Sequence, residues 1–178
     1  GSAGQFVVRA GGVEYGARTV VVCSGAHHRK LGLEGEDRLR GRGVSYCALC
    51  DGNFFRNQTV AVVGGGNAAL EESLYLSKLV SKLYLIHRRD EFRARKIYQD
   101  KLTEQSDKRS SVVTALHGEK ELTGLTVKNL KSGEETLLPV NGLFVYVGFS
   151  PSTGFLPADL AKDEQGFIIT DTEMRTNI

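Results

Sequence analysis

The chain is organised around the stretch Thr59-Val-Ala-Val-Val-Gly-Gly-Gly-Asn-Ala-Ala69. Its first five residues form a continuous apolar run, which predicts a buried strand. From Gly66 to about Val80 the apolar residues recur at helical spacing. Lys82-Leu-Tyr-Leu-Ile86 then predicts a second strand, and residues 93–102 predict a second helix. Strand, helix and strand in this order indicate a βαβ unit with a parallel sheet.

The turn between the first strand and its helix has the pattern Gly64-x-Gly66-x-x-Ala69. The first glycine permits the tight turn, and the second lets the backbone approach a pyrophosphate. The small third residue allows the helix and strand to pack closely, while the helix N-terminus offers free N–H groups to phosphates. A glycine-rich loop in an unrelated α/β fold is the alternative. The strand before the turn and the helix after it favour dinucleotide binding.

A basic cluster follows the second strand, at His87-Arg88-Arg89. A site for NAD would carry an acidic residue there to hold the ribose 2′-hydroxyl. Guanidinium groups instead pair bidentately with a 2′-phosphate, and Arg93 lies one helical turn beyond Arg89. We therefore predict NADPH rather than NADH, with a solvated basic loop as the alternative.

Two cysteines, Cys47 and Cys50, are spaced so that their thiols lie within disulfide reach. Asp51 follows them directly. A thiolate that leaves a mixed disulfide needs a proton, which a partly buried carboxyl group can deliver. Asp51 could also serve as a helix cap.

A structural zinc site is the main alternative for the cysteine pair, but it needs four ligands. There is no second pair, His27 and His28 are adjacent, and His117 is isolated. We therefore expect no metal, and we expect His27 and His28 in an exposed loop. The third cysteine, Cys23, ends the apolar run Thr19–Cys23, which predicts a buried strand. One tight pair and one odd cysteine favour a reducing, cytoplasmic compartment.

Hairpins are expected on both sides of the βαβ unit. Gly11-Gly12 predicts a two-residue turn, and Lys131-Ser-Gly133 predicts a turn within a β-meander. The strands around these turns are expected at residues 5–10, 13–17, 122–130 and 134–138. A last buried parallel strand is expected at residues 142–147. Residues 27–46 read as a connecting segment, and residues 151–178 show little periodicity.

The composition excludes several classes of protein. The chain has 178 residues, of which 40% are hydrophobic and 25% charged, as in soluble globular domains. A net charge of +2 gives no argument for nucleic acid or a membrane surface. No apolar run reaches the length of a membrane span, and the N-terminus has no signal-sequence pattern.

Three motifs in this order resemble the low-molecular-weight thioredoxin reductases: Tyr46-Cys-Ala-Leu-Cys-Asp-Gly52, Val62-Val-Gly-Gly-Gly-Asn-Ala-Ala-Leu-Glu-Glu72 and Leu85-Ile-His-Arg-Arg-Asp-Glu-Phe-Arg-Ala94. The resemblance spans about residues 5–178. It implies a homodimeric FAD enzyme in which an inserted NADPH-binding domain carries the redox disulfide. In this family NADPH reduces the flavin, the flavin reduces the disulfide, and the dithiol reduces thioredoxin.

The resemblance also implies roles for individual residues. Cys47 and Cys50 would form the redox disulfide, with Asp51 as the acid–base residue. The cofactor-binding residues would be Gly64, Gly66, Asn67 and Ala69 for the pyrophosphate, His87, Arg88, Arg89 and Arg93 for the 2′-phosphate, Gly148 near the nicotinamide, and Ser24 and Gly25 at the FAD-domain turn.

The resulting expectation is a Rossmann-like α/β domain at residues 27–150, flanked by incomplete FAD-domain segments at residues 1–26 and 151–178. The family's FAD-binding glycine motif and its later Gly-Asp element are not found, so we expect a fragment or an incomplete chain. Thr103–Ser111 is short, and the strand that follows the second helix in the family is not visible. Two other functions are considered: a non-catalytic NADPH-binding module, and a flavoprotein reductase that serves a peroxiredoxin. The latter group typically lacks the arginine cluster.

Overall fold

The structure is a computed structural model that describes residues 6–102 and 106–178. The chain divides into two units, which are described separately. Unit 1 comprises Gly1–His27 and Ser150–Ile178, and unit 2 comprises His28–Phe149. The boundaries expected from the sequence lie within one residue of these. The assignment of the units to FAD and NADPH remains a prediction.

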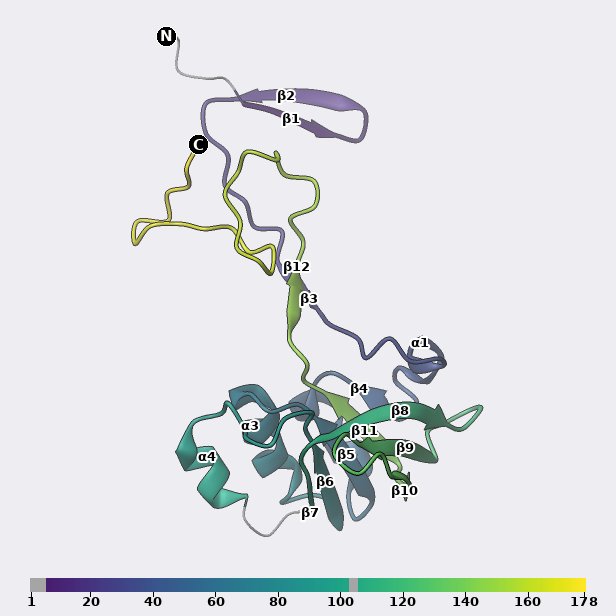
Figure 1. Cartoon of the computed structure of the whole chain (residues 1–178). Helices are drawn as coiled ribbons and strands as arrows, with labels where there is room; N and C mark the ends of the chain where they lie inside the picture. The colour runs from purple at the N-terminus through teal and green to yellow at the C-terminus, as the bar shows by residue number, and fades with distance from the viewer. Residues whose placement is uncertain (1–5, 103–105) are drawn as a thin grey trace. The chain divides into compact units, whose positions relative to one another are not determined.

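Unit 2 is built on a five-stranded sheet in the order β4-β11-β5-β6-β7, in which every neighbouring pair is parallel (Figure 1). Its strands are β4 (Val44–Ser45), β5 (Thr59–Val63), β6 (Lys82–Ile86), β7 (Ser106–Lys108) and β11 (Gly142–Val145). The parallel sheet expected from the βαβ pattern is confirmed. Two expectations are wrong: β7 is the strand that was not visible in the sequence, and β4 lies inside the supposed connecting segment. Both strands are too short to give a periodic signal.

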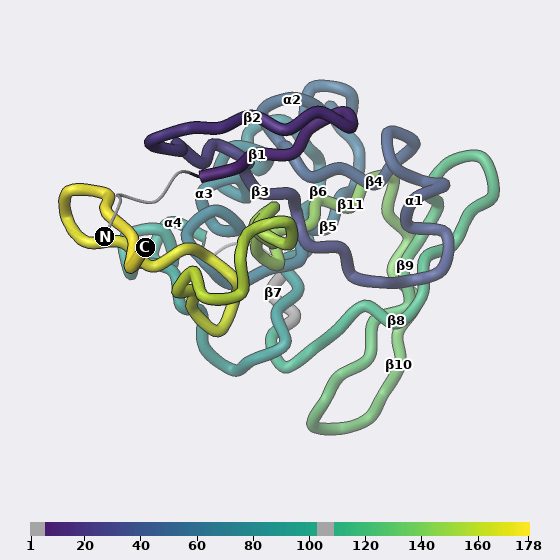
Figure 2. The backbone as a smooth tube through the Cα atoms, turned by 90° about the horizontal axis from the view of Figure 1, so that it is seen from above, coloured from purple at the N-terminus to yellow at the C-terminus, as the bar shows by residue number. Residues whose placement is uncertain are grey.

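Helices cover one face of this sheet (Figure 2). They are α3 (Asn67–Leu76) and α4 (Lys96–Lys101). Val60 and Val62 of β5 point to this face and share a buried cluster with Leu70. Both helices are shorter than expected. The N–H groups of Arg93 and Ala94 donate to the carbonyl of Gly65, at 2.8 and 3.1 Å, so α4 begins only after them.

An antiparallel meander covers the opposite face, as the expected hairpin turn implied (Figure 2). Its strands are β8 (Ser111–His117), β9 (Gly124–Asn129) and β10 (Glu135–Pro139), in the order β10-β9-β8. Ala61 and Val63 of β5 point to this side and share a second buried cluster with Leu125. Successive residues of β5 therefore serve opposite layers, as the two-residue period of a strand requires.

Three short helical turns complete unit 2. They are α1 (Glu36–Leu39), α2 (Ala48–Asp51) and the 3₁₀ turn η1 (Gly52–Phe55). α1 and α2 flank β4 in the chain. Leu39 and Ala48 are fully buried, so the segment that carries the cysteines is anchored in the core rather than exposed as a loop.

Unit 1 contains the predicted N-terminal hairpin, formed by β1 (Phe6–Ala10) and β2 (Val13–Ala17). Ala10 pairs with Val13, and the two glycines between them have φ values of 58° and 79°. Positive φ at both turn positions is what a tight two-residue hairpin needs, so the Gly-Gly prediction is confirmed. β3 (Ala26–His28) pairs with β12 (Phe149–Pro151) in a separate two-stranded sheet.

Two sequence expectations are wrong in this part of the chain. Thr19–Cys23 is not a strand: Val21 is 85% exposed, and Cys23 is an exposed free thiol. The strand preference of β-branched residues reflects packing against neighbours, and no strand in the described part of the chain pairs with this run. His27 and His28 lie on β3 rather than in a loop; His27 is exposed, and His28 is half-buried with its ring 4.6 Å from the Phe149 ring.

Candidate active site

A cavity of about 640 Å³ lies where β5, β6 and β11 end. Its lining includes Gly64–Ala69, which we call the glycine turn, together with His87, Arg88 and Arg93. The chain continues from β5 to β6 on one side, whereas β11 lies on the other side of β5. Ligands of open α/β sheets bind at such switch points, beyond the carboxyl ends of the strands.

The glycine turn is tightly packed at Gly64 and open at Gly66. A Cβ atom on Gly64 would lie 2.6 Å from the carbonyl oxygen of Tyr146 and 2.7 Å from the Cβ of Ala69. Ala69 is itself buried, so a small residue is needed there. A Cβ on Gly66, in contrast, would meet no atom within 4 Å, and no side chain caps the N-terminus of α3. The open turn and uncapped helix therefore suit a pyrophosphate.

His87 packs beneath this turn. It is 6% exposed, its ring is stacked 5.4 Å from Phe92, and a Cβ on Gly65 would lie 2.3 Å from it. Burial lowers the pKa of His87, and the nearby arginines lower it further. His87 is therefore uncharged at neutral pH, which suits a packing role better than charge pairing with a phosphate.

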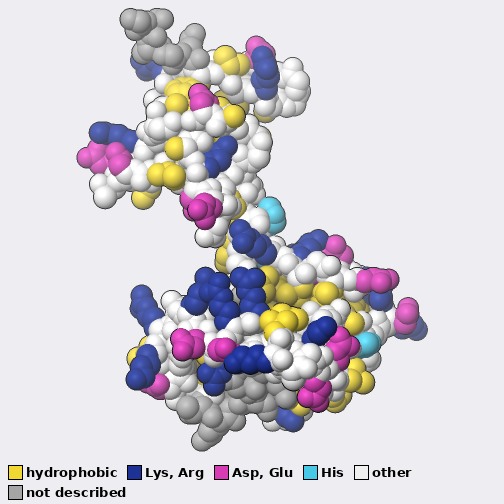
Figure 3. Space-filling model, viewed as in Figure 1, with side chains coloured by type: hydrophobic (Ala, Val, Ile, Leu, Met, Phe, Trp, Pro, Cys, Tyr) yellow, Lys and Arg dark blue, Asp and Glu magenta, His cyan; other side chains and the backbone are white. Residues whose placement is uncertain are grey.

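The arginines lie on the loop His87–Arg93, which we call the arginine loop. Arg88, Arg89 and Arg93 are exposed. The loop is tied to the glycine turn because the N–H of Arg93 donates to the carbonyl of Gly65 at 2.8 Å. Figure 3 shows Lys and Arg side chains gathered on one face of this unit. The sequence could indicate the charges, but it could not indicate this backbone contact with the turn.

Asn67 was predicted to hold the pyrophosphate. Its Oδ1 accepts a hydrogen bond of 2.8 Å from the N–H of Arg95, so this oxygen fastens the start of α4 to the glycine turn.

Two acidic residues, Asp90 and Glu91, lie within the arginine loop, and Asp90 is paired with a cation. The Asp90 carboxylate is 2.7 Å from Lys131 Nζ and accepts a hydrogen bond from Ser110. The hydrogen bond from Lys131, followed by that from Ser110, lowers the pKa of Asp90. Lys131 lies in the β9–β10 turn, so the meander supplies a cation that compensates this carboxylate.

Cys47 and Cys50 form a disulfide. We call Cys47–Cys50 the cysteine turn. Cys47 stands at the N-cap of α2, where its Sγ accepts a hydrogen bond from the N–H of Cys50 at 3.1 Å. Cys50 is exposed and Leu49 is 64% exposed, so solvent and a partner can reach the bond. The Cys-x-x-Cys spacing was sufficient to predict the pair.

Asp51 lies beside the cysteine turn, but it is not a helix cap. It precedes η1 and makes no side-chain hydrogen bond to that turn. Its Oδ2 instead accepts a hydrogen bond of 2.6 Å from Ser45 Oγ. The helix-cap interpretation is therefore wrong, and Ser45 is a site residue that the sequence did not indicate.

Tyr146 contacts both the cavity and the cysteine turn. Its ring lines the cavity, and its hydroxyl accepts a hydrogen bond of 2.8 Å from the N–H of Ala48. Burial raises the pKa of Tyr146, and the carboxylate of Glu72 raises it further, so the phenol stays protonated. Ala48 and Tyr146 are far apart in sequence, so no local pattern could have revealed this contact.

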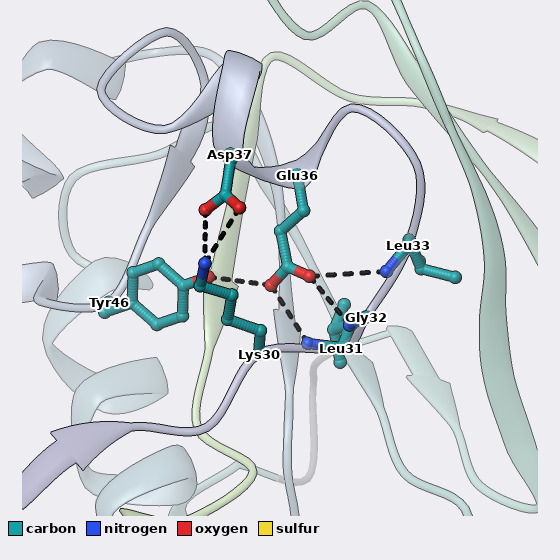
Figure 4. Close-up of polar contacts among 7 residues, drawn as sticks. All are labelled: Lys30, Leu31, Gly32, Leu33, Glu36, Asp37 and Tyr46. Atoms are coloured by element: carbon teal, nitrogen blue, oxygen red, sulfur yellow. Dashed lines mark hydrogen bonds and ion pairs between the residues drawn. The ribbon is translucent and has the colours of Figure 1, made fainter.

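Glu36 fastens the segment that precedes the cysteine turn (Figure 4). It is 2% exposed, and its carboxylate accepts hydrogen bonds from the N–H groups of Leu31, Gly32 and Leu33. The hydroxyl of Tyr46 donates to it at 2.7 Å. Leu31 lines the cavity and Tyr46 precedes Cys47, so one buried carboxylate supports both regions.

The three other predicted cofactor residues are divided between the two units. Gly148 lines the cavity, and its carbonyl accepts a hydrogen bond of 2.9 Å from the N–H of Arg29. Ser24 and Gly25 belong to unit 1, where the Gly25 carbonyl accepts one of 2.9 Å from the N–H of Ser152. Their roles toward cofactors remain predictions.

Two searches of the described part of the chain gave negative results. At residues 6–102 and 106–178, no group of three or more His, Cys, Asp or Glu side chains could hold a metal ion. Over the same residues, none of the helices combines the length and the apolarity that crossing a membrane requires.

Residues 2–178 match the family model described as pyridine nucleotide-disulphide oxidoreductase. The chain belongs to this family. The thioredoxin reductase of Listeria monocytogenes is 46% identical over 96% of this chain and 55% of its own length, and that of Treponema pallidum is 43% identical over 97% and 57%. The chain therefore spans about half the length of the curated relatives it matches.

Solved structures of thioredoxin reductases are similar as well. That of Lactococcus lactis, in the FR conformation, has a TM-score of 0.85 and 40% identity over 97% of this chain and 58% of its own. That of T. acidophilum has a TM-score of 0.87 and 31% identity over 100% and 60%. The resemblance inferred from the three motifs is confirmed, as is the Rossmann-like fold.

Proposed function

We propose that this chain belongs to an NADPH-dependent thioredoxin-disulfide reductase. The observation that carries the proposal is the accessible Cys47–Cys50 disulfide in the same unit as a dinucleotide cavity, with Tyr146 in contact with both. The relatives named thioredoxin reductase support it. An oxidised cysteine pair with one exposed member, Cys50, beside an acid–base carboxylate is suited to thiol–disulfide exchange.

NADPH would bind in the cavity of unit 2. The glycine turn would hold the pyrophosphate against the N-terminus of α3, because a Cβ is excluded at Gly64 while the space over Gly66 is open. Arg88, Arg89 and Arg93 would pair with the 2′-phosphate. His87 would support the turn from below rather than contribute charge.

The family resemblance also implies FAD, which supplies the transfer of an electron pair from NADPH to the disulfide when it is bound. The described residues of unit 1 contain strands but no helix, so they offer no helix N-terminus for a second pyrophosphate. The FAD site therefore does not fit the residues described in unit 1, and we assign it no step.

The partner would approach at the cysteine turn. Leu49 and Phe54 are 64% and 77% exposed, and they stand in and just after this turn. Exposed apolar side chains beside a reactive bond suit a protein substrate, and we assign thioredoxin to this surface. The family resemblance also supports a homodimer, and the single tight cysteine pair supports a cytoplasmic location.

The test uses the full-length protein with NADPH, thioredoxin and a disulfide reporter. We expect thioredoxin-dependent oxidation of NADPH, and we expect Cys47→Ser and Cys50→Ser each to abolish it. Cys23→Ser is the matched control, since it removes an exposed thiol that forms no disulfide. Full activity in either Cys47→Ser or Cys50→Ser would refute the assignment of the disulfide.

The same assay distinguishes the other functions. A non-catalytic NADPH-binding module would bind nucleotide but show no oxidation with thioredoxin. A reductase that serves a peroxiredoxin would use NADH at least as well as NADPH. The exposed arginine loop argues against the latter.

A further inference from the structure

We propose that Ser45 is a positioning residue for Asp51. Its hydroxyl holds one carboxylate oxygen, Oδ2, and so leaves the other, Oδ1, to receive and release the proton during disulfide exchange. The inference rests on the proposed function, because it concerns the same cysteine pair. Ser45 touches neither sulfur, so its effect on the reaction passes through Asp51.

The hydrogen bonds of Ser45 fix the direction of its proton. Ser45 is 5% exposed, and its Oγ lies 2.6 Å from Asp51 Oδ2, 3.1 Å from Cys47 N and 3.3 Å from Cys47 O. A hydroxyl group has one hydrogen to donate. The shortest contact is to the carboxylate, so the hydroxyl donates there and accepts from the N–H of Cys47.

The two residues joined by the hydrogen bond between Ser45 and Asp51 come from different elements. Ser45 lies on β4, an edge strand of the parallel sheet, where it is paired with Phe144 of β11. Asp51 lies at the end of the four-residue α2, where its N–H donates to the carbonyl of Cys47 at 3.1 Å. Pairing in the sheet therefore fixes the position of Ser45, and the hydrogen bond from its hydroxyl holds the Asp51 carboxylate in one orientation.

The proton transfers during the exchange define the role of Asp51 Oδ1. One cysteine thiolate attacks a sulfur of the partner's disulfide; that bond breaks, and the partner's other sulfur leaves as a thiolate that is protonated from solvent. The second cysteine gives its proton to Asp51 Oδ1 and attacks the mixed disulfide. The Cys47–Cys50 bond forms, and the partner's remaining sulfur leaves and takes that proton from Oδ1. Two electrons and two protons reach the partner in all.

Several titratable groups lie near Asp51. The cysteines belong to the adjacent cysteine turn, and Tyr146, directly after β11, interacts electrostatically with Asp51. Glu72 of α3 acts on the same phenol, and its Oε2 is buried with no hydrogen-bond partner in the described part of the chain. A pH effect must therefore be separated from Glu72 as well as from the thiols.

Ser45→Ala removes the donor to Oδ2 and leaves the N–H of Cys47 without this acceptor. A hydrogen bond to a carboxylate favours its ionised form. We therefore expect the acid limb of the pH–rate profile to move to higher pH. The rate of exchange should fall about 5- to 20-fold at neutral pH, since the carboxylate is no longer held in one orientation.

The experiment measures the pH–rate profile of thioredoxin reduction in the full-length protein. The same profile is measured for the dithiol, prepared with a chemical reductant, reacting with a small aromatic disulfide. Ser45→Thr, which restores a hydroxyl, should recover most of the rate. Ser77→Ala, which removes a hydroxyl that donates to the Leu74 carbonyl, is the matched control, and Glu72→Gln tests the neighbouring carboxylate.

The outcomes separate this inference from the proposed function. The role of Ser45 is supported if the acid limb of the pH–rate profile moves in Ser45→Ala and returns in Ser45→Thr. The limb should not move in Glu72→Gln or in Ser77→Ala. If the acid limb of the pH–rate profile does not move in Ser45→Ala while Asp51→Asn loses activity, the role of Ser45 is wrong and the proposed reductase function still holds. An equal fall in Ser45→Ala and Ser45→Thr with no change of limb also overturns the role of Ser45. Full activity in both Cys47→Ser and Cys50→Ser would remove the reductase itself.

Discussion

Glu36→Gln is the substitution whose cost the structure defines best. The Glu36 carboxylate accepts hydrogen bonds from the N–H of Leu31 at 2.9 Å, of Gly32 at 2.8 Å and of Leu33 at 3.4 Å, and from the hydroxyl of Tyr46 at 2.7 Å. A glutamine has one oxygen and one NH₂ group. If its oxygen keeps the contacts to Gly32 and Leu33, its NH₂ group faces the N–H of Leu31, and neither can accept.

The magnitude follows from this mismatch. The Tyr46 hydroxyl can turn and accept, but the N–H of Leu31 stays without a partner at a carboxylate that is 2% exposed. One unsatisfied buried donor, and the loss of charge from the remaining bonds, should lower the free energy of unfolding by about 2–4 kcal/mol. For a unit of this size that corresponds to a fall in Tm of about 5–15 °C.

The assay has a global and a local component. Thermal unfolding of the full-length protein gives the fall in Tm, and hydrogen exchange at the three backbone amides tests its cause. We expect faster exchange at Leu31, Gly32 and Leu33 in Glu36→Gln. Asp37→Asn is the matched control, because Asp37 pairs only on the surface with Lys30, and it should change stability by less than about 1 kcal/mol. Unchanged exchange at these amides, or an equal fall in Tm in both variants, would refute the reasoning.

Two further predictions concern the site. Arg88→Ala combined with Arg89→Ala should lower the affinity for NADPH by about tenfold or more and leave that for NADH unchanged, as measured by binding titrations; an equal loss for both nucleotides would contradict the assignment of the 2′-phosphate. Tyr146→Phe leaves the N–H of Ala48 without its acceptor, so thioredoxin-dependent turnover should fall about two- to tenfold while NADP⁺ affinity stays the same. Tyr98→Phe, on α4, is the control, and equal turnover in the two variants would exclude a role for the Tyr146 hydroxyl.

Much of the fold was readable from local pattern. β5, the glycine turn, α3 and β6 follow one another with clear periodicity, and the N-terminal hairpin has a turn that only glycine favours. The cysteine turn was readable for the same reason, since a spacing of three residues brings the thiols together without any distant contact.

The wrong predictions of strands arose where a segment with strand composition had no neighbouring strand to pair with, or where a strand was very short. Thr19–Cys23 has strand composition but pairs with no described strand, whereas β4 and β7 owe their existence to pairing with β11 and β6. A strand is stabilised by pairing with its neighbours, and a sequence of two or three residues does not indicate which distant strands will pair with it.

The sequence by itself determined the βαβ unit, the glycine turn, the arginine loop and the cysteine turn, because each depends on residues that lie close together in the chain. Only the tertiary structure decided what holds the cysteine turn in place. Ser45 orients Asp51 from β4, Tyr146 contacts Ala48 from near the other end of the unit 2 sequence, and Glu36 accepts a hydrogen bond from Tyr46, which precedes Cys47. These are hydrogen bonds of buried polar groups, and their partners are chosen by how the layers pack rather than by any spacing along the chain.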